Sequence, residues 1–503
     1  MNTKSARNTK ATAGGDSEPS SDVQKSAYPL PKSIAWGLMW ASLLLLIVGT
    51  LWAMGSPSGF YVVMGSVACV LVSLPMVLDR RYDMISPWSL VALAVYIGSG
   101  IRPIFVALGR DGTRSVDDLF LLGHAPEFFL RPGGLYLLGL ALMTLGYLTG
   151  ARRKYRAPVG DRYEFNRTAN VVILLCALIG LVGFVLYANS SGGFSLSRIS
   201  AKRSTIEGLD VGAEYSSNGQ YRLINTFAAV AFWAQVAYYS ARPNHNSLLS
   251  HRGLYLALLF VNASMLPLYA STRSDIVYLV IIAIVIKLAL SNGVFARRLV
   301  LGGLAFVLVV TPVLTSLRTA ATGVSQSDTS RTALLLDTFI YSRTFTDVPT
   351  SALIIDAVPE SLQFAKGSTI GAWIAAPVPR RMWPGKPLIS SGPVIGINVF
   401  GNVRSGVPPG LIAESYWNFG QFGLLTMPLA FGFALRRIES WTQPAGRGNP
   451  GTVLIFSTCV VKLGVDATTN SLGYALFTAT QTFGLLTVFL LLAGSFSGYR
   501  NRS

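Results

Sequence analysis

Long apolar runs dominate this chain and constrain its fold more than any other feature. The first run, Ile34–Met54, has about 21 residues, and about 20 helical residues cross the hydrocarbon layer of a bilayer. Eleven similar runs follow, at about 58–78, 86–108, 133–150, 170–188, 223–241, 253–271, 275–291, 299–317, 411–435, 451–465 and 474–494. The alternating pattern of a β-barrel is missing, so helices are the remaining way to satisfy the backbone inside lipid. We predict an all-α polytopic membrane protein with about 12 transmembrane helices.

Two of these runs are irregular. The run at 86–108 is interrupted by Gly98, Gly100 and Pro103, and the run at 451–465 is short for a span. Proline removes a backbone hydrogen bond, and glycine weakens a helix interior. We therefore expect a disturbed helix in the first run and a short one in the second.

The low charge of the chain supports the same fold class. Of 503 residues, 13% are charged and 51% hydrophobic, and the mean hydropathy is +0.48. Soluble proteins carry about 25% charged residues, so a water-soluble globule and a disordered chain are both excluded. Cys69, Cys176 and Cys459 lie inside apolar runs and the histidines are scattered, which excludes a disulfide framework and argues against zinc. We expect no metal and no cofactor.

The distribution of positive charge predicts the orientation. Lys and Arg outnumber Asp and Glu by 41 to 23, a net charge of +18. With the N-terminus inside and alternating runs, the inside segments hold 22 Lys and Arg and the outside segments 16, eight of them in the loop 318–410. Long loops do not count in the positive-inside rule, which leaves 22 against 8. We predict an N-in, C-in protein and no nucleic-acid partner.

The runs divide the chain into five parts. These are a disordered cytoplasmic tail (1–33), an N-terminal transmembrane bundle of about nine helices (34–317), a large periplasmic loop (318–410), C-terminal transmembrane helices (411–494) and a cytoplasmic tail (495–503).

The loop at 318–410 is long enough to have a function of its own. Structureless loops of this length are uncommon, and this one contains Trp373, Trp383 and further aromatic residues. Apolar residues recur at helical spacing over 334–340, so we expect short helices lying along the outer membrane surface. Loop lengths in the two halves of the chain do not correspond, which argues against an inverted-repeat transporter.

Arg273 is the first candidate for binding an anion on the outer side. It lies between two closely spaced runs, in the segment Ser271–Asp275. An arginine at this depth either holds an anion at the membrane surface, or reaches the interface with its long side chain, or pairs with Asp275.

A second group of cations lies in the run Pro377–Pro387. Four prolines there restrict three cations, Arg380, Arg381 and Lys386, next to Trp383. The run is either a rigid anion site or an anchor in the lipid interface. Outer cations oppose the usual charge bias, and a diphosphate would explain them, since each charge-assisted bond contributes about 1.5–3 kcal/mol. Arg198, Arg203, Arg318 and Arg343 are further candidates of this kind.

A third motif opens the run after the long loop. Glu414 and Asn418 are four residues apart and share one helix face, with Tyr416 between them. Glu414 is a candidate general base or a partner for an arginine. The alternative is a structurally paired carboxylate at the interface.

At these residues the chain resembles the bacterial oligosaccharide repeat-unit polymerases, the O-antigen (Wzy-type) polymerase family. Three features carry the resemblance: the Arg273 segment, the Pro-x-Pro-Arg-Arg-x-Trp-Pro-Gly-Lys-Pro run, and the Glu-x-Tyr-x-Asn-Phe-Gly-x-x-Gly run that ends at Gly423. A motif of Arg, ten residues and Gly is associated with the outer loops of this family, and Arg381 with Gly392 fits it. About a dozen spans and a large outer loop also agree.

The resemblance implies a GT-C-like fold and a metal-independent, inverting glycosyl transfer. Polyprenyl-diphosphate-linked repeat units of an O-antigen, capsule or exopolysaccharide would be joined outside the bacterial cytoplasmic (inner) membrane. The enzyme would mainly position two substrates and hold the charge of the departing diphosphate. The candidate catalytic residues are Arg273, Arg380, Arg381 and Glu414. The candidate substrate-binding residues are Arg198, Arg203, Arg318, Arg343, Trp383, Lys386, Tyr416 and Asn418.

Two other functions stay open. O-antigen ligases are expected to carry a histidine in the large outer loop, and 318–410 contains none. A lipid-linked oligosaccharide flippase or transporter would need charges at mid-membrane. Of the charges inside the runs, Lys287 is expected to reach the inner surface and Lys462 the outer one. Expected partners are lipid-linked oligosaccharides, the bilayer, a chain-length regulator and a flippase.

Overall fold

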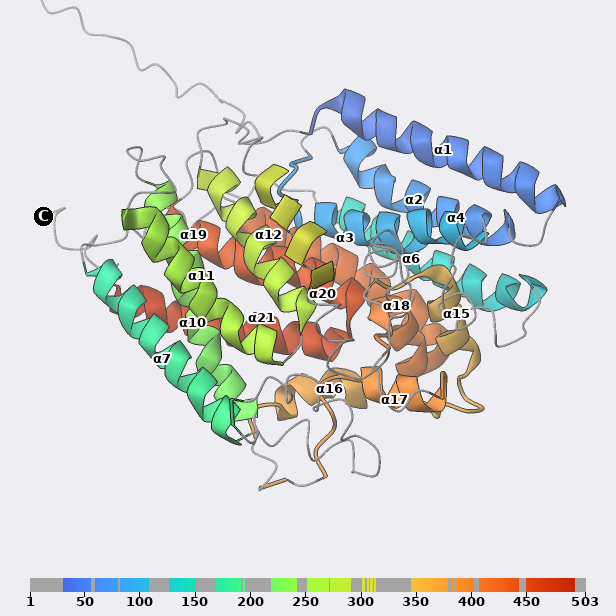
Figure 1. The fold of residues 1–503 in the computed structure, drawn as a ribbon. Helices are drawn as coiled ribbons and strands as arrows, with labels where there is room; N and C mark the ends of the chain where they lie inside the picture. Colours follow the sequence, from blue (N-terminus) through green and yellow to red (C-terminus); the bar gives the residue numbers. More distant parts are fainter. Residues whose placement is uncertain are drawn as a thin grey trace, which may run out of the picture.

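A computed structural model describes most of the chain, with gaps, and every regular element in it is a helix. The described residues are 30–55, 59–79, 82–107, 126–150, 168–190, 193–194, 219–241, 251–270, 272–290, most of 301–313, 345–378, 382–383, 385–401, 407–442 and 449–493. This part contains no β-strand, so the predicted all-α class is confirmed for it (Figure 1).

The helices follow the predicted runs closely. In the first part of the chain they are α1 (Lys32–Gly55), α2 (Gly59–Leu78), α3 (Pro87–Val95), the π-helix η1 (Tyr96–Ile101), α4 (Arg102–Ala107), the 3-10 helix η2 (Pro126–Phe129), α6 (Leu130–Thr149), α7 (Ala169–Ser190), α10 (Gly219–Ser240), α11 (His251–Tyr269) and α12 (Arg273–Leu290). In the second part they are α15 (Val348–Asp356), α16 (Ser368–Ala375), α17 (Gly392–Asn398), α18 (Gly410–Thr442), α19 (Pro450–Ile455), the π-helix η4 (Phe456–Val461), α20 (Lys462–Thr469) and α21 (Leu472–Leu492).

Eight helical segments of the described part are long and apolar enough to cross a membrane, which supports a multi-pass membrane protein. They are Lys32–Gly55, Gly59–Leu78, Pro87–Phe105, Glu127–Thr149, Ala169–Ser190, His251–Tyr269, Pro450–Thr469 and Leu472–Leu492. The helices α10, α12 and α18 coincide with predicted runs but are not among the eight; α12, for example, carries three charged residues. About twelve crossings and the N-in orientation therefore stay predictions.

The two irregular runs both contain a π-helix. In the first, η1 lies between α3 and α4, where Gly98 and Gly100 precede Pro103. In the second, η4 lies between α19 and α20, and the continuous helix reaches Thr469. The predicted span at 451–465 therefore ends too early, because the helix continues through Asp466 to Thr469. π-Helical turns are rare and occur frequently at functional sites.

The helices α6 and α18 pack with their backbones in close contact. A Cβ atom on Gly146 would lie 2.1 Å from the carbonyl oxygen of Leu429, and one on Gly432 would lie 2.0 Å from that of Met143. Only glycine fits at such contacts, since a methyl group would push the helices apart. The two helices lie side by side (Figure 1).

The helix α18, which covers the predicted run at 411–435, is interrupted near its start. Phe419 and Gly420 have non-helical backbone angles, and Gly420 has φ +60°, which favours glycine. A Cβ atom on Gly423 would lie 2.2 Å from the carbonyl oxygen of Ser415. Residues eight apart in a straight helix are roughly 12 Å apart along its axis, so the chain turns sharply here.

The described part of the large loop folds onto the bundle as short helices, as predicted, but α15 does not lie along a surface. All residues from Val348 to Ile355 are buried, because α15 packs against α2, α6 and α18. The helices α16 and α17 lie at the lower edge of the molecule in Figure 1, and α16 packs against α21. The predicted helix at 334–340 lies outside the described residues.

The helix ends fall into two groups at opposite ends of α6. At one end, Gly133 faces Val348 of α15. At the other, Tyr147 bonds to Arg436 near the end of α18. We call these the loop end and the network end. The helices α2, α6 and α18 finish at the network end, and the predicted alternation also places these three ends on one side.

Candidate functional site

Arg222, at the start of α10, is a cation held in place at the loop end. Its Nη2 donates to the hydroxyl oxygen of Tyr187 on α7 at 3.0 Å, and its guanidinium carbon lies 5.3 Å from the centre of that ring. Asp275 of α12 and Tyr474 of α21 lie close enough to interact electrostatically with it. Four helices therefore meet around one half-buried guanidinium.

Arg273 is the first residue of α12, two positions before Asp275. Its backbone therefore lies at the same helix end as the carboxylate that interacts with Arg222. The side chain of Arg273 lies outside the described residues.

Lys462 and Asp466, four residues apart in α20, form an ion pair inside the bundle. Lys462 Nζ bonds to Asp466 Oδ2, and it lies 4.7 Å from the centre of the Tyr278 ring on α12. The same Asp466 oxygen accepts a hydrogen bond from Thr478 Oγ1 of α21 at 3.2 Å. Lys462 was expected to reach the outer surface, but its ammonium points to this buried carboxylate instead. The spacing of four residues in one helix was a signal that sequence reasoning passed over.

Glu414 connects α18 to the start of α21. The residue is fully buried, and its Oε2 accepts a hydrogen bond from the backbone N–H of Leu472, the first residue of α21. A carboxylate there satisfies a free N–H group and complements the positive end of the helix dipole. These contacts agree with the interpretation of Glu414 as a structurally paired carboxylate.

Asn418 fastens the loop to α18. Its Nδ2 donates to Thr369 Oγ1 at 2.7 Å and to the carbonyl oxygen of Glu414 at 2.8 Å, and its Oδ1 accepts from the backbone N–H of Gly367 at 2.8 Å. Tyr416 is half-buried and packs against the hydrophobic core. The Glu-x-Tyr-x-Asn-Phe-Gly pattern thus serves to dock the segment before α16 onto a broken helix.

Lys386 closes the proline-rich run onto the end of α16. Its ammonium donates to the carbonyl oxygens of Ala376 at 3.1 Å and Val378 at 2.7 Å, a usual way to satisfy carbonyls at a helix end. Trp383 is 47% exposed and Met382 is 78% exposed, so the described tip of this run points away from the core. Arg198, Arg203, Arg318, Arg343, Arg380 and Arg381 lie outside the described residues.

Sequence reasoning missed a buried ion pair that fastens the loop to the bundle. Arg102 Nη1 lies 2.5 Å from Asp347 Oδ2, and both side chains are at most 3% exposed. The backbone N–H of Thr350 also donates to Asp347, which begins α15. The break in the helix beside Arg102 was visible in the sequence. Its partner, 245 positions later, was not.

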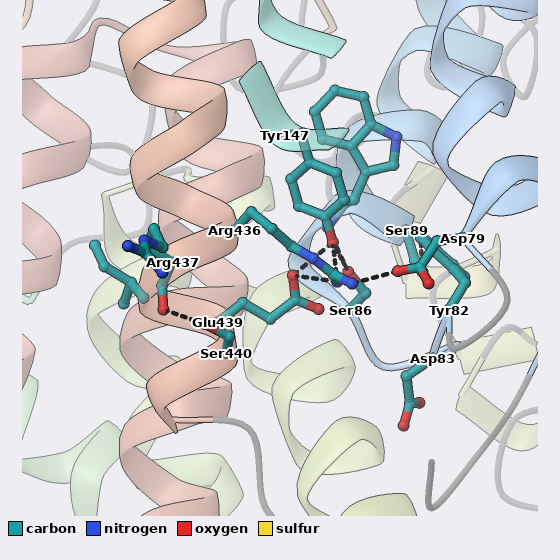
Figure 2. A network of polar contacts seen from close by, with 12 residues as sticks. Asp79, Tyr82, Asp83, Ser86, Ser89, Tyr147, Arg436, Arg437, Glu439 and Ser440 are labelled. Carbon is teal, nitrogen blue, oxygen red and sulfur yellow. Dashed lines mark hydrogen bonds and ion pairs between the residues drawn. The ribbon is translucent and has the colours of Figure 1, made fainter. Parts of the chain in front are cut away.

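A second polar cluster holds the network end together (Figure 2). Arg436 on α18 bonds to Asp79 after α2, to Glu439 one turn later, and to the Tyr147 hydroxyl at 3.0 Å. Trp88 stacks on Tyr147, with ring centres 4.5 Å apart. These bonds join three helix ends, which indicates a structural clamp, although Glu439 Oε1 has no hydrogen-bond partner in the described part of the chain.

Tyr82, in the short segment between α2 and α3, completes this clamp (Figure 2). Its hydroxyl bonds to Ser89 Oγ at 2.8 Å, and burial raises the pKa of Tyr82, so the phenol stays neutral and can donate.

Comparisons with known protein families, with curated proteins and with solved structures find no match to this chain.

Proposed function

We propose that this protein is a membrane-integral glycosyltransferase. It polymerises oligosaccharide repeat units, each carried on a polyprenyl diphosphate, at the outer face of the bacterial cytoplasmic membrane. The observation that supports the proposal is the cation held at the loop end. Arg222 lies beside the Tyr187 ring there and interacts with Asp275, which is in the first turn of the helix that Arg273 opens.

The chemistry of the reaction matches such a site. The diphosphate leaves the anomeric carbon as negative charge builds on its oxygens, so fixed positive charge lowers the barrier. Arg222 and Arg273 hold the diphosphate near the membrane surface. Arg380 and Arg381 contribute from the proline-rich run, which Lys386 ties to α16. Forked guanidinium donors suit phosphate oxygens better than ammonium groups do.

A transporter of lipid-linked oligosaccharides is the second candidate, favoured by one observation. The Lys462–Asp466 pair is buried and follows a π-helical turn in a segment that can span the membrane. Ionisable residues and broken helices inside the membrane are typical of transport pathways.

Glycan sizes in the native host separate these functions. We expect Arg273→Ala or Arg381→Ala to leave single repeat units on the acceptor and to remove the long chains, while Arg273→Lys keeps part of the polymer. Arg437→Ala at the network end is the matched control and should leave chain lengths unchanged. Complete loss of surface glycan in the Arg273→Ala strain would instead favour the transporter or a ligase.

A further inference from the structure

Tyr187 lies where a tightly packed pair of helices reaches the loop end. A Cβ atom on Gly183 of α7 would lie 2.5 Å from the backbone nitrogen of Asn225 on α10, so the two backbones are in close contact. Gly183 precedes Tyr187 by about one turn, and Asn225 follows Arg222 by about one turn. Tyr187 and Arg222 therefore face each other beside a contact at which the two helices have little room to shift.

The ring of Tyr187 is itself held in place. It is 1% exposed and makes an edge contact with Tyr269 of α11, with ring centres 6.0 Å apart. Tyr269 in turn donates a hydrogen bond to the carbonyl oxygen of Gly193 at 2.8 Å. Because protein interiors are close-packed, a buried ring with such neighbours has few other positions. The hydroxyl of Tyr187 is therefore a fixed acceptor.

Arg222 keeps most of its hydrogen-bonding capacity for a ligand. A guanidinium has five N–H donors, and within the described part of the chain one of them has an acceptor, the Tyr187 hydroxyl oxygen at 3.0 Å. Asp275 interacts with Arg222 electrostatically, but none of the ion pairs among the described residues involves Arg222. The side chain of Arg222 is half-buried, and Gln220 on the same turn is exposed.

This arrangement differs from that of the two buried arginines described above. Arg102 and Arg436 are each paired with carboxylates, so their charge is already compensated. Arg222 is fixed by a neutral phenol and an aromatic ring instead, so its position is set while its charge is not compensated by a direct partner. A half-exposed cation of this kind suits an anion that arrives from outside the bundle.

We infer that Tyr187 is a positioning residue for the diphosphate of the lipid-linked substrate; this inference rests on the diphosphate site of the proposed function. Tyr187 fixes the guanidinium of Arg222 through its hydroxyl and its ring, and the other N–H donors of Arg222 bind the diphosphate oxygens. A mobile arginine loses rotamer freedom when it binds a ligand, whereas an arginine that is already held loses less. Tyr187 acts through Arg222 and does not touch the substrate.

The test measures the affinity of the purified full chain in detergent for polyprenyl diphosphate. Tyr187→Phe keeps the buried ring and loses the hydroxyl, so the packing is preserved. We expect it to weaken binding roughly 3- to 10-fold, the cost of ordering one long side chain. Arg222→Ala should weaken binding roughly 10- to 100-fold, since hydrogen bonds to a charged group are lost. The double variant should bind like Arg222→Ala, because Tyr187 acts through Arg222 alone.

Tyr238→Phe is the matched control. The Tyr238 hydroxyl of α10 accepts a hydrogen bond from Asn170 Nδ2 of α7 at 3.3 Å, so it joins the same two helices near their other ends. This variant should bind with wild-type affinity. A purely structural role of Tyr187 predicts the same further loss when Tyr187→Phe is added to Arg222→Ala, or an equal loss in Tyr238→Phe. Either result overturns the inference, as does wild-type affinity in Tyr187→Phe.

Turnover separates this inference from the proposed polymerisation. The same chain in lipid vesicles is given a lipid-diphosphate-linked repeat unit from the native host, and released polyprenyl diphosphate is measured. We expect Tyr187→Phe to lower kcat/KM and the double variant to match Arg222→Ala again. A wild-type chain that binds polyprenyl diphosphate but releases none overturns the polymerisation and leaves the role of Tyr187 in binding. A wild-type chain that does not bind polyprenyl diphosphate overturns both.

Discussion

At the scale of single residues, the buried pair Arg102–Asp347 gives the clearest prediction. Removing one partner of a buried ion pair costs about 3–5 kcal/mol, because the other charge stays buried without compensation. We expect Arg102→Ala to lower the unfolding temperature in detergent strongly. Scanning fluorimetry of the native tryptophans measures this temperature. Arg102→Met combined with Asp347→Leu should recover most of the loss. A double variant no more stable than the single one would contradict this account.

Glu414 gives a second prediction at this scale. Glu414→Ala leaves the N–H of Leu472 without its acceptor, and an unsatisfied buried group costs about 1–3 kcal/mol. Glu414→Gln keeps an acceptor oxygen and should cost less. Both are measured by thermal unfolding in the same detergent. Equal stability of Glu414→Ala and the wild type would show that this hydrogen bond does not stabilise the fold.

The sequence indicated several of these residues but could not assign their roles. The motif from Glu414 to Gly423 stood out by its spacing. Its side chains bond to the N–H of Gly367 before α16, to the hydroxyl of Thr369 in α16 and to the first N–H of α21. Arg102 could not be paired, since nothing in a sequence brings position 347 next to position 102. Arg436 looked like one more cytoplasmic charge, although it bonds three partners.

At the scale of elements, the packing of α6 against α18 gives a third prediction. Gly146→Ala places a methyl group 2.1 Å from the carbonyl oxygen of Leu429, so the helices must separate at a cost of about 1–3 kcal/mol. Gly134→Ala in the same helix is the matched control, because no atom lies within 4 Å of its Cβ position. It should be neutral or slightly stabilising. The unfolding temperatures of the two variants test this prediction. An equal decrease in both variants would contradict the close packing of α6 against α18.

Helices as elements were predictable because a run of about 20 apolar residues leaves the backbone few alternatives in lipid. The boundaries of α2 and α7 agree with the predicted runs within two residues. Interruptions were harder to place. Gly98 and Gly100 predicted the disturbed helix at η1. No comparable residue pattern predicted the π-helix η4. The turn at Gly420 depends on the loop segment that packs against it, which the sequence could not show.

At the scale of the whole molecule, the two ends should face opposite sides of the membrane. Trp383 and Trp441 are exposed to similar extents, 47% and 44%, at the loop end and the network end. We expect a membrane-impermeant maleimide to label Trp383→Cys in intact spheroplasts, and Trp441→Cys only after permeabilisation. The native cysteines are buried and should give little background. Labelling in the opposite order would reverse the orientation and remove the outer cation site.

The central claim is that the loop end joins sugars carried on a lipid diphosphate, and one measurement tests it most directly. The purified chain is incubated in vesicles with a single kind of lipid-diphosphate-linked repeat unit, and the products are sized by mass spectrometry. The account predicts a ladder of lipid-linked oligomers and one released polyprenyl diphosphate for each new linkage. Repeat units that remain single under conditions where the protein is folded would contradict it.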